Sequence, residues 1–347
     1  IIMVEYLSGN RIQGSSTLSE SPPQTSWKKL GSGTISSGSA SASTSSFTAK
    51  DNMMVLGNIN GGNGYAIQFG HSSGAIDTGS NYRERYITDG TTNTQALRGD
   101  IWCYYDSNDD QMFNVSEISN YNGAEKFVFM KTASRDGTSP KLNKAVGKWT
   151  QTNQIDKVQV KSFSNVSADS KFVVIGCDND ESDSGTNFWE SIGSKTLDSS
   201  TNSFSVDLTS TKDFLMFVLT KEKTGGYVNP KLAFNDNTSN YKTRSSDNGG
   251  SPTDPSGGGN AHIFLRAGEA DGRSFTVGYI CNLAGVQHGV ITDSTNAGSE
   301  GAGTAIDRNQ AFGWWQDTSR ITKINISHGA SGSFASGTKI EVFGGNI

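Results

Sequence analysis

Short apolar runs separated by polar turns dominate the pattern along the chain. The runs are about four to eight residues long, rich in Val, Ile, Phe and Tyr, and recur roughly every 10–25 residues between Gly, Ser, Asn and Asp. Some alternate with polar residues, as in 204–208, and others are continuously apolar, as in 214–219. No window of helical length keeps a 3.6-residue period. The pattern predicts an all-β protein of two-sheet sandwiches with one solvated face per sheet.

The chain also resembles itself at a separation of about 160 residues. Trp27-Lys28-Lys29-Leu30-Gly31 matches Trp189-Glu190-Ser191-Ile192-Gly193, and further matches follow to the last strand. The matching segments are 27–31 and 189–193, 50–56 and 212–219, 77–82 and 236–241, 147–149 and 313–315, and 171–176 and 339–344. The separation drifts only slightly, so the chain is predicted to hold two copies of one fold.

These matches define the expected domain organisation. We predict an N-terminal arm at 1–26, a first domain at 27–178, an acidic linker at 179–186 and a second domain at 187–347. About eight strands in ~150 residues fit a jelly roll better than a seven-stranded immunoglobulin sandwich of ~100 residues. The expected fold is therefore two tandem jelly-roll-like β-sandwiches related by internal duplication.

The arm has no counterpart before the second copy. It opens with a strand-like piece that contains Met3, Val4, Tyr6 and Leu7. A short apolar strand of this kind covers an edge of its own domain or pairs with a neighbouring subunit, and the sequence leaves both alternatives open.

Composition narrows the class of protein. Charged residues make up 18%, below the ~25% of ordinary soluble domains, and the 41 glycines argue against helices. The net charge of −5 and the scattered Lys and Arg residues provide no basic face, so nucleic-acid binding is not expected. The longest apolar run, 214–219, is far shorter than the ~20 residues of a spanning helix, so membrane insertion is not expected either.

The cysteines do not form a motif. Cys103, Cys177 and Cys281 are far apart and lack C-x-x-C spacing. We expect three small buried hydrophobic residues, with one disulfide and a spare thiol as the alternative.

Several motifs together resemble a known group of proteins. They are W-x-x-L-G at 27–31, D-T-G-S-N-Y-x-x-R at 77–85, G-K-W at 147–149 and N-F-W-E at 187–190. This combination resembles a family of mostly uncharacterised proteins encoded by viruses of marine archaea and by marine metagenomes. The resemblance covers nearly the whole chain, although the second copy reads D-N-T at 236–238 and G-W-W at 313–315. It implies a structural protein of the virion or an extracellular surface and carries over no catalytic residue.

No motif indicates catalysis. Gly70-His71-Ser72-Ser73-Gly74 matches G-x-S-x-G, but the nucleophile elbow requires a following helix, and the pattern predicts none here. The four histidines are not repeated between the copies, so we do not expect an enzyme.

One loop places oxygen ligands at alternate positions. Asp106, Asn108 and Asp110 follow the spacing of a calcium loop but lack the Gly and the distant Glu of an EF-hand. A solvated acidic turn is the favoured interpretation, and structural Ca²⁺ is the alternative. No other cofactor is expected.

The aromatic residues fall into two groups, those that occur at matching positions in both copies and those that occur in one copy only. Trp27, Trp149, Trp189 and Trp315 recur in both copies and are expected to pack inside the fold, as are Tyr82 and Tyr241 in their Ser-Asn-Tyr turns. A sugar-stacking patch is the alternative for these turns. The unrepeated residues are candidates for an interface or a glycan site, namely Trp102, Tyr104, Tyr105 and Trp314.

The leading hypothesis is a non-enzymatic virion structural protein, a capsid, tail or decoration subunit that self-assembles on the particle surface. Its partners would be copies of itself and other virion proteins. The alternative is a carbohydrate-binding adhesin or receptor-binding fibre that binds host surface glycans. A third hypothesis is a subunit of a cellular surface layer or filament. All three place the protein on a virion or at the extracellular surface.

Overall fold

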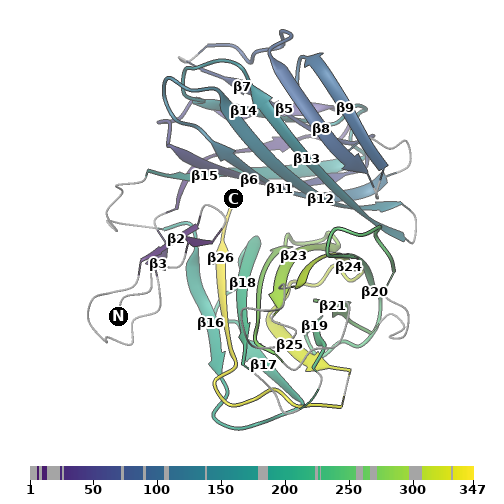
Figure 1. Cartoon of the computed structure of the whole chain (residues 1–347). Helices are drawn as coiled ribbons and strands as arrows, with labels where there is room; N and C mark the ends of the chain where they lie inside the picture. The colour runs from purple at the N-terminus through teal and green to yellow at the C-terminus, as the bar shows by residue number, and fades with distance from the viewer. Residues whose placement is uncertain are drawn as a thin grey trace. The chain divides into compact units, whose positions relative to one another are not determined.

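The structure is a computed structural model of the chain. It describes residues 6–7, 10–13, 24–25, 27–71, 74–88, 91–104, 109–136, 139–178, 187–222, 226, 228–254, 261–265, 272–296, 307–329 and 331–347. All the regular elements in these ranges are β-strands, paired in antiparallel sheets, and none of the described residues forms a helix able to cross a membrane (Figure 1). The chain divides into two compact units, the first mainly from residues 1–190 and the second mainly from 191–346. The acidic linker 179–186 lies outside the described residues.

The first unit is a two-sheet sandwich. Its large sheet has the order β4 (Lys28–Ile35), β15 (Ala168–Cys177), β6 (Asn52–Asn60), β11 (Asp109–Ser119), β12 (Lys126–Asp136), β13 (Ser139–Trp149), β8 (Tyr82–Thr88) and β9 (Thr91–Arg98). Its small sheet has the order β10 (Ile101–Tyr104), β7 (Tyr65–Gly70), β14 (Lys157–Lys161) and β5 (Ser41–Ser43).

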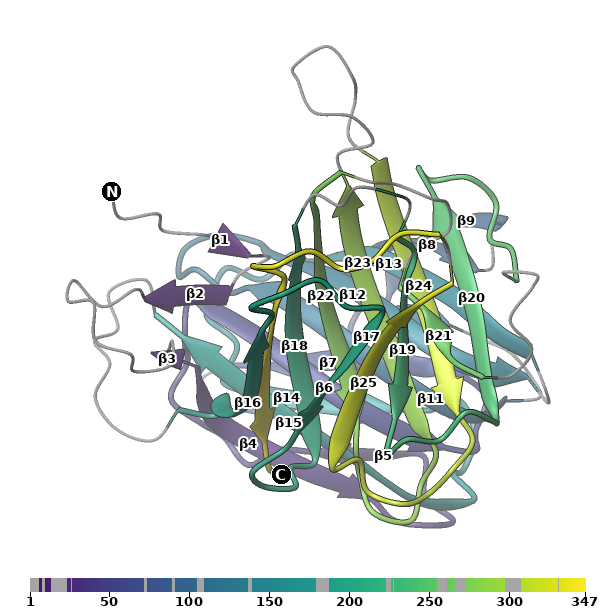
Figure 2. The same cartoon turned by 90° about the horizontal axis from the view of Figure 1, so that it is seen from below.

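The second unit is also a two-sheet sandwich. Its large sheet runs β16 (Glu190–Thr196), β26 (Lys339–Gly345), β18 (Phe214–Lys221), β22 (Ser274–Cys281), β23 (His288–Asn296), β24 (Asp307–Trp315) and β20 (Tyr241–Asp247). The small sheet runs β17 (Ser203–Asp207), β25 (Lys323–His328), β19 (Pro230–Phe234) and β21 (Ile263–Phe264), and Figure 2 shows these strands in front of β18, β22, β23 and β24.

The two units share one strand order. Each large sheet has the first strand of its unit at one edge, with the last strand of the unit beside it. When β9 is set aside, the strands correspond one to one in both sheets, from β4 with β16 to β15 with β26.

The arm contributes a separate small sheet. Its strands are β1 (Tyr6–Leu7), β2 (Asn10–Gln13) and β3 (Gln24–Thr25), and these pair with one another. Met3 and Val4 lie outside the described residues.

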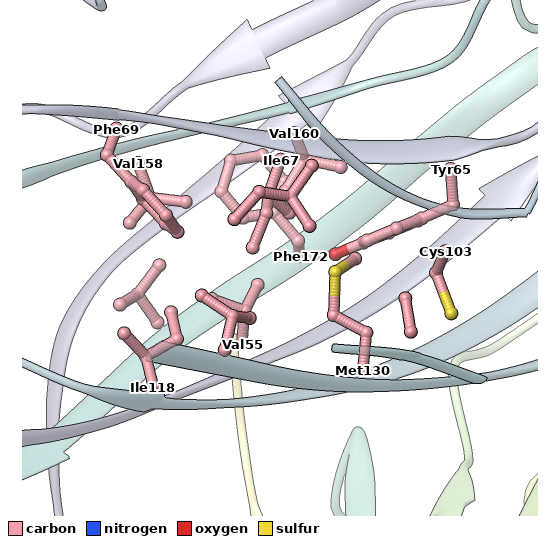
Figure 3. Packing of buried hydrophobic residues seen from close by; sticks show 14 of the residues in the cluster. Val55, Tyr65, Ile67, Phe69, Cys103, Ile118, Met130, Val158, Val160 and Phe172 are labelled. Atoms are coloured by element: carbon pink, nitrogen blue, oxygen red, sulfur yellow. The ribbon is translucent and has the colours of Figure 1, made fainter. Parts of the chain in front are cut away.

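Side chains from both sheets fill the core of the first unit. Val55, Ile118 and Met130 point inward from the large sheet toward Ile67 and Val158 of the small sheet (Figure 3). All are buried, and each such side chain contributes about 1.5–3 kcal/mol relative to an exposed one. In the second unit, Leu215, Phe217 and Leu219 of β18 belong to a core that also includes side chains of β19 and β25.

Strand patterns follow from this arrangement. Strand β14 alternates buried and half-buried residues, as expected for a sheet with one solvated face. The cysteines Cys103, Cys177 and Cys281 are buried and are not joined in a disulfide, which confirms the expectation of small buried side chains.

A buried asparagine closes the end of each sandwich. The Nδ2 of Asn120 donates to the carbonyls of Lys50 (2.9 Å) and Ile155 (3.1 Å), and its Oδ1 accepts from the amide of Ile155 (2.7 Å). Asn282 repeats this set with Lys212 (2.9 Å) and Ile321 (3.3 and 2.7 Å). Each side chain thus pairs backbone groups of two loops that would otherwise be buried without partners.

Replacing either asparagine should therefore destabilise its unit. We expect Asn120→Ala and Asn282→Ala each to lower the free energy of unfolding by about 2–3 kcal/mol, because buried backbone groups lose their partners. Urea unfolding followed by tryptophan fluorescence measures this. The control is Asn122→Ala in an exposed turn, which should change stability by less than about 0.5 kcal/mol. Equal, small effects of all three changes would contradict the role of these side chains.

Candidate functional site

The repeated tyrosines and tryptophans pack inside the fold. Tyr82 stacks on Trp149 with ring centroids 6.2 Å apart, and its hydroxyl accepts from the amide of Phe69 (2.9 Å) and donates to the carbonyl of Asp77 (3.0 Å). Tyr241 stacks on Trp315 in the same way, with centroids 5.8 Å apart. The four repeated tryptophans and both tyrosines are almost completely buried. Their expected packing role is confirmed.

The Ser-Asn-Tyr turn of the first unit is held by an aspartate. Carboxylate oxygens of Asp77 accept hydrogen bonds from the amide of Gly79, from Nδ2 of Asn81 and from Nε1 of Trp149, each at 2.8 Å. These hydrogen bonds lower the pKa of Asp77 against the opposing effect of its burial. The carboxylate is therefore committed to the turn.

The expected calcium loop falls largely outside the described residues. Asp106 and Asn108 are not described, and Asp110 is described only through its backbone in β11. Among the described residues, no three His, Cys, Asp or Glu side chains gather as a metal site would require.

The unrepeated aromatic residues do not form one group. Trp102 is half-buried on β10, whereas Trp314 on β24 is fully buried and its ring is not presented to a sugar. Tyr104 is described only through its backbone, and Tyr105 lies outside the described residues.

Trp102 is held in a network of charged groups. The guanidinium of Arg98 lies 3.3 Å from the centroid of the Trp102 ring, and the ring of Phe163 lies 4.2 Å away. The indole Nε1 donates to Oδ1 of Asp100 (2.6 Å), which also pairs with Lys161 through Oδ2 (2.8 Å). Arg98 therefore covers a face of the ring that a sugar would need for stacking.

A buried glutamate supports this network. The side chain of Glu84 is fully buried, accepts a hydrogen bond from the amide of Trp102, and has Oε1 3.9 Å from Nε of Arg98. Burial raises the pKa of Glu84 to about 7, although Trp102 and Arg98 oppose the shift. No motif marks Glu84 in the sequence, because it lies between Arg83 and Arg85 in a strand that reads as polar at its centre.

An apolar surface lies on the solvated side of β12, β13 and β8. Phe127 is 51% exposed, Phe129 58%, Val146 47% and Ile87 36%. These side chains point away from the core, because each alternates with a residue packed inside it, such as Val128 beside Phe127 and Phe129. We call these four residues the exposed apolar face.

Charged residues flank the exposed apolar face on two sides. Arg83 and Arg85 lie on β8 with Ile87, and Glu117 of β11 lies directly opposite Phe129. Lys148 of β13 pairs with Glu125, the residue before β12, at 2.7 Å. Cations also lie on β12 and β13, where Lys131 and Lys148 are on the same side of their strands as Phe129 and Val146. The continuous apolar run 127–130 is typical of a strand that is apolar on both faces, but it does not indicate which face remains open.

Glu84 should make the stability of the first unit depend on pH. Its folded pKa of about 7 exceeds the ordinary value of 4.5, so its contribution is fully present below about 4.5 and is lost as pH rises through about 7. We expect Glu84→Gln to remove this dependence, so that the variant gains stability relative to the unaltered protein between pH 5 and pH 8. Urea unfolding at both pH values measures the difference. Parallel pH profiles would contradict a perturbed Glu84.

Comparisons with known proteins leave the family open. No protein-family model matches the chain, and no curated protein matches it. Among solved structures, mouse laminin alpha1 chain, domains LG4-5, is similar over 91% of this chain and 88% of that chain, with 10% identity and a TM-score of 0.20. Neisserial surface protein A is similar over 81% of this chain and 99% of that chain, with 6% identity and a TM-score of 0.13. Likenesses this weak carry no functional argument.

Proposed function

We propose that this protein is a non-enzymatic structural subunit that self-assembles on the surface of a virus particle, as a capsid, tail or decoration protein. We further propose that its two units are jelly-roll-like sandwiches that arose by internal duplication. The motif resemblance to proteins of marine archaeal viruses suggests the setting. The exposed apolar face is the single observation that supports assembly most directly.

Matched details in the two units support the duplication. Beyond the shared strand order, a Cβ on Gly147 would lie within 2.6 Å of Ile101, and a Cβ on Gly313 would lie within 2.9 Å of Ile263. In both units, the absence of a side chain on a glycine of the large sheet therefore leaves room for an isoleucine of the small sheet. The same close approach at corresponding strands is expected if one ancestral sandwich was copied.

The exposed apolar face suits a second copy of this chain. Two adjacent phenylalanines on one strand that are each more than half exposed form an apolar surface of the kind that marks interaction sites. In a two-fold arrangement the same face of two copies would meet, so that each copy would bury the apolar side chains of the other. The same patch on both copies would then form an isologous contact.

Glycan binding is less well supported. Its best candidate, Trp102, is half-buried and has a ring face covered by Arg98, so it does not offer an open platform. We therefore favour self-assembly as the main function.

Placing a charge on the exposed apolar face should disrupt assembly. We expect Phe129→Asp to weaken self-association at least tenfold while leaving the fold intact, because a desolvated carboxylate would enter the contact. Size-exclusion chromatography with light scattering over a concentration series measures the shift. Ser41→Asp, at an exposed position on the small sheet, is the matched control. If both variants associate like the unaltered protein, the face is not the contact.

The arm provides a second test. We expect a chain that starts at Trp27 to stay folded but to lose ordered assembly, if the arm bridges subunits. Negative-stain electron microscopy of fractions from size-exclusion chromatography distinguishes regular shells, tubes or sheets from dispersed particles. Normal assembly of the shortened chain would exclude this role for the arm.

A further inference from the structure

One end of the second sandwich has a polar interior. Lys221 is the last residue of β18, Ser274 is the first residue of β22, and Asn296 is the last residue of β23. The strand register places Lys221 opposite Ser274 and Ser274 opposite Asn296. These side chains point into the sandwich, because they keep the period of two set by core residues such as Leu219 and Val290. All three are at most 8% exposed, so a polar row crosses the interior here.

Two more buried polar side chains continue this row onto the neighbouring strands. Asn309 of β24 lies directly opposite Ser294, two residues before Asn296 on β23. Ser245 of β20 lies two residues before Asp247, which is directly opposite Asn309. Side chains in such diagonal positions are about 7–8 Å apart. We call the set of five the polar end cluster, namely Lys221, Ser274, Asn296, Asn309 and Ser245.

Most polar atoms of the polar end cluster are left unpaired by the fold. Nδ2 and Oδ1 of both Asn296 and Asn309, and Oγ of Ser245, are buried without a hydrogen-bond partner among the described residues. Lys221 differs, because its ammonium donates to the carbonyl of Gly272. Unpaired polar groups inside a protein lower its stability, and native proteins contain few of them. Five such atoms at one end of one sandwich therefore call for an explanation outside the fold itself.

The first unit shows that this fold does not require a polar end. Counting from the matched Asn120 and Asn282 and from the other matched residues, apolar or aromatic residues occupy three of the corresponding positions: Ile59 for Lys221, Met112 for Ser274 and Tyr86 for Ser245. Ile59 and Met112 lie opposite each other and belong to the buried core of their unit. The same framework therefore closes with apolar side chains in one unit and with polar ones in the other.

The amide at this end is also better paired in the first unit. Asn143 corresponds to Asn309, and its Nδ2 donates to Oγ of Ser134 (3.1 Å), the residue that corresponds to Asn296. Only Oδ1 of Asn143 has no partner among the described residues. In the second unit, a second carboxamide takes the place of the serine, and both amides lose this pairing.

The unpaired groups define the chemistry of a ligand. A carboxamide offers two N–H donors and an acceptor oxygen, and a serine hydroxyl donates and accepts. None of these groups is charged. A matching ligand is therefore neutral and carries several groups that both donate and accept, as the hydroxyls of a sugar do. The cluster lies at strand ends, next to the connecting loops that carry the binding sites of many scaffolds.

We propose that the polar end cluster of the second unit binds a neutral sugar, such as the end residue of a glycan, through Asn296, Asn309 and Ser245. This site is separate from Trp102, which belongs to the first unit, and from the exposed apolar face. The proposal goes beyond self-assembly and does not depend on it, because each copy of the chain carries the whole cluster.

Saturation-transfer difference NMR of the full chain with D-glucose, D-galactose, D-mannose and N-acetyl-D-glucosamine tests the proposal. We expect saturation transfer to at least one of the four sugars. Asn296→Ser, which introduces the residue of the first unit, should weaken that binding roughly tenfold or more, because the sugar loses a carboxamide partner. It should not unfold at a lower urea concentration, since no hydrogen bond of Asn296 with the described residues is lost. The matched control is Asn122→Ser in an exposed turn of the first unit, which should bind the sugar unchanged.

Hydrogen exchange of the unaltered protein keeps the test independent of the variant's folding. A saturating concentration of the bound sugar should slow exchange at the end of β23 and the start of β24, and leave β12 and β13 unchanged. Absence of saturation transfer to all four sugars would mean that only water pairs with these amides, and the proposal would be wrong. Equal binding by Asn296→Ser and Asn122→Ser, or slowed exchange confined to the first unit, would also overturn it.

Discussion

Pairing of buried backbone groups at the ends of the sandwiches is the constraint on which the rest of the structure depends. Strands pair their own amides and carbonyls within the sheets, but the connections between sheets leave such groups without ladder partners. In this protein, polar side chains inside the fold supply those partners. Asn120 and Asn282 each bind two loops at once, and Tyr82 and Tyr241 bind the turn that leads into their own strand. The apolar cores can close only because these connections are satisfied.

The two units use one framework and vary it at a few interior positions. Glu84 accepts a hydrogen bond from the amide of Trp102, and at the corresponding place Thr243 accepts one from the amide of Phe264 (3.3 Å). Both units therefore keep a hydrogen bond between a strand of the large sheet and a strand of the small sheet at this place. The acceptor is an ionisable carboxylate in the first unit and a hydroxyl in the second. A second difference lies at the first residue of β12 and of β23, where a buried lysine in one unit corresponds to a buried histidine in the other. The two units thus keep one strand order while their buried polar residues differ.

The surface suggests how such a protein would act. The described residues hold no grouped metal ligands, and the buried side chains of Glu84 and His288 lie against backbone groups within the fold. The most distinctive open feature is the exposed apolar face with its flanking charges. A face of this kind on a rigid sheet positions a partner without requiring any movement of the sandwich, which suits a building block of a larger assembly.

The sequence by itself determined the all-β class and the packing role of the aromatic residues at matched positions. These follow from local rules: alternation marks strands, Gly and Asn mark turns, and a tryptophan found at matched positions is most simply a core residue. Only the tertiary structure decided which side of an apolar strand stays open, as at Phe129, and which polar residue becomes buried, as at Glu84 and His288. Burial and pairing of this kind depend on neighbours far away in the chain, and the pattern around a single residue does not contain them.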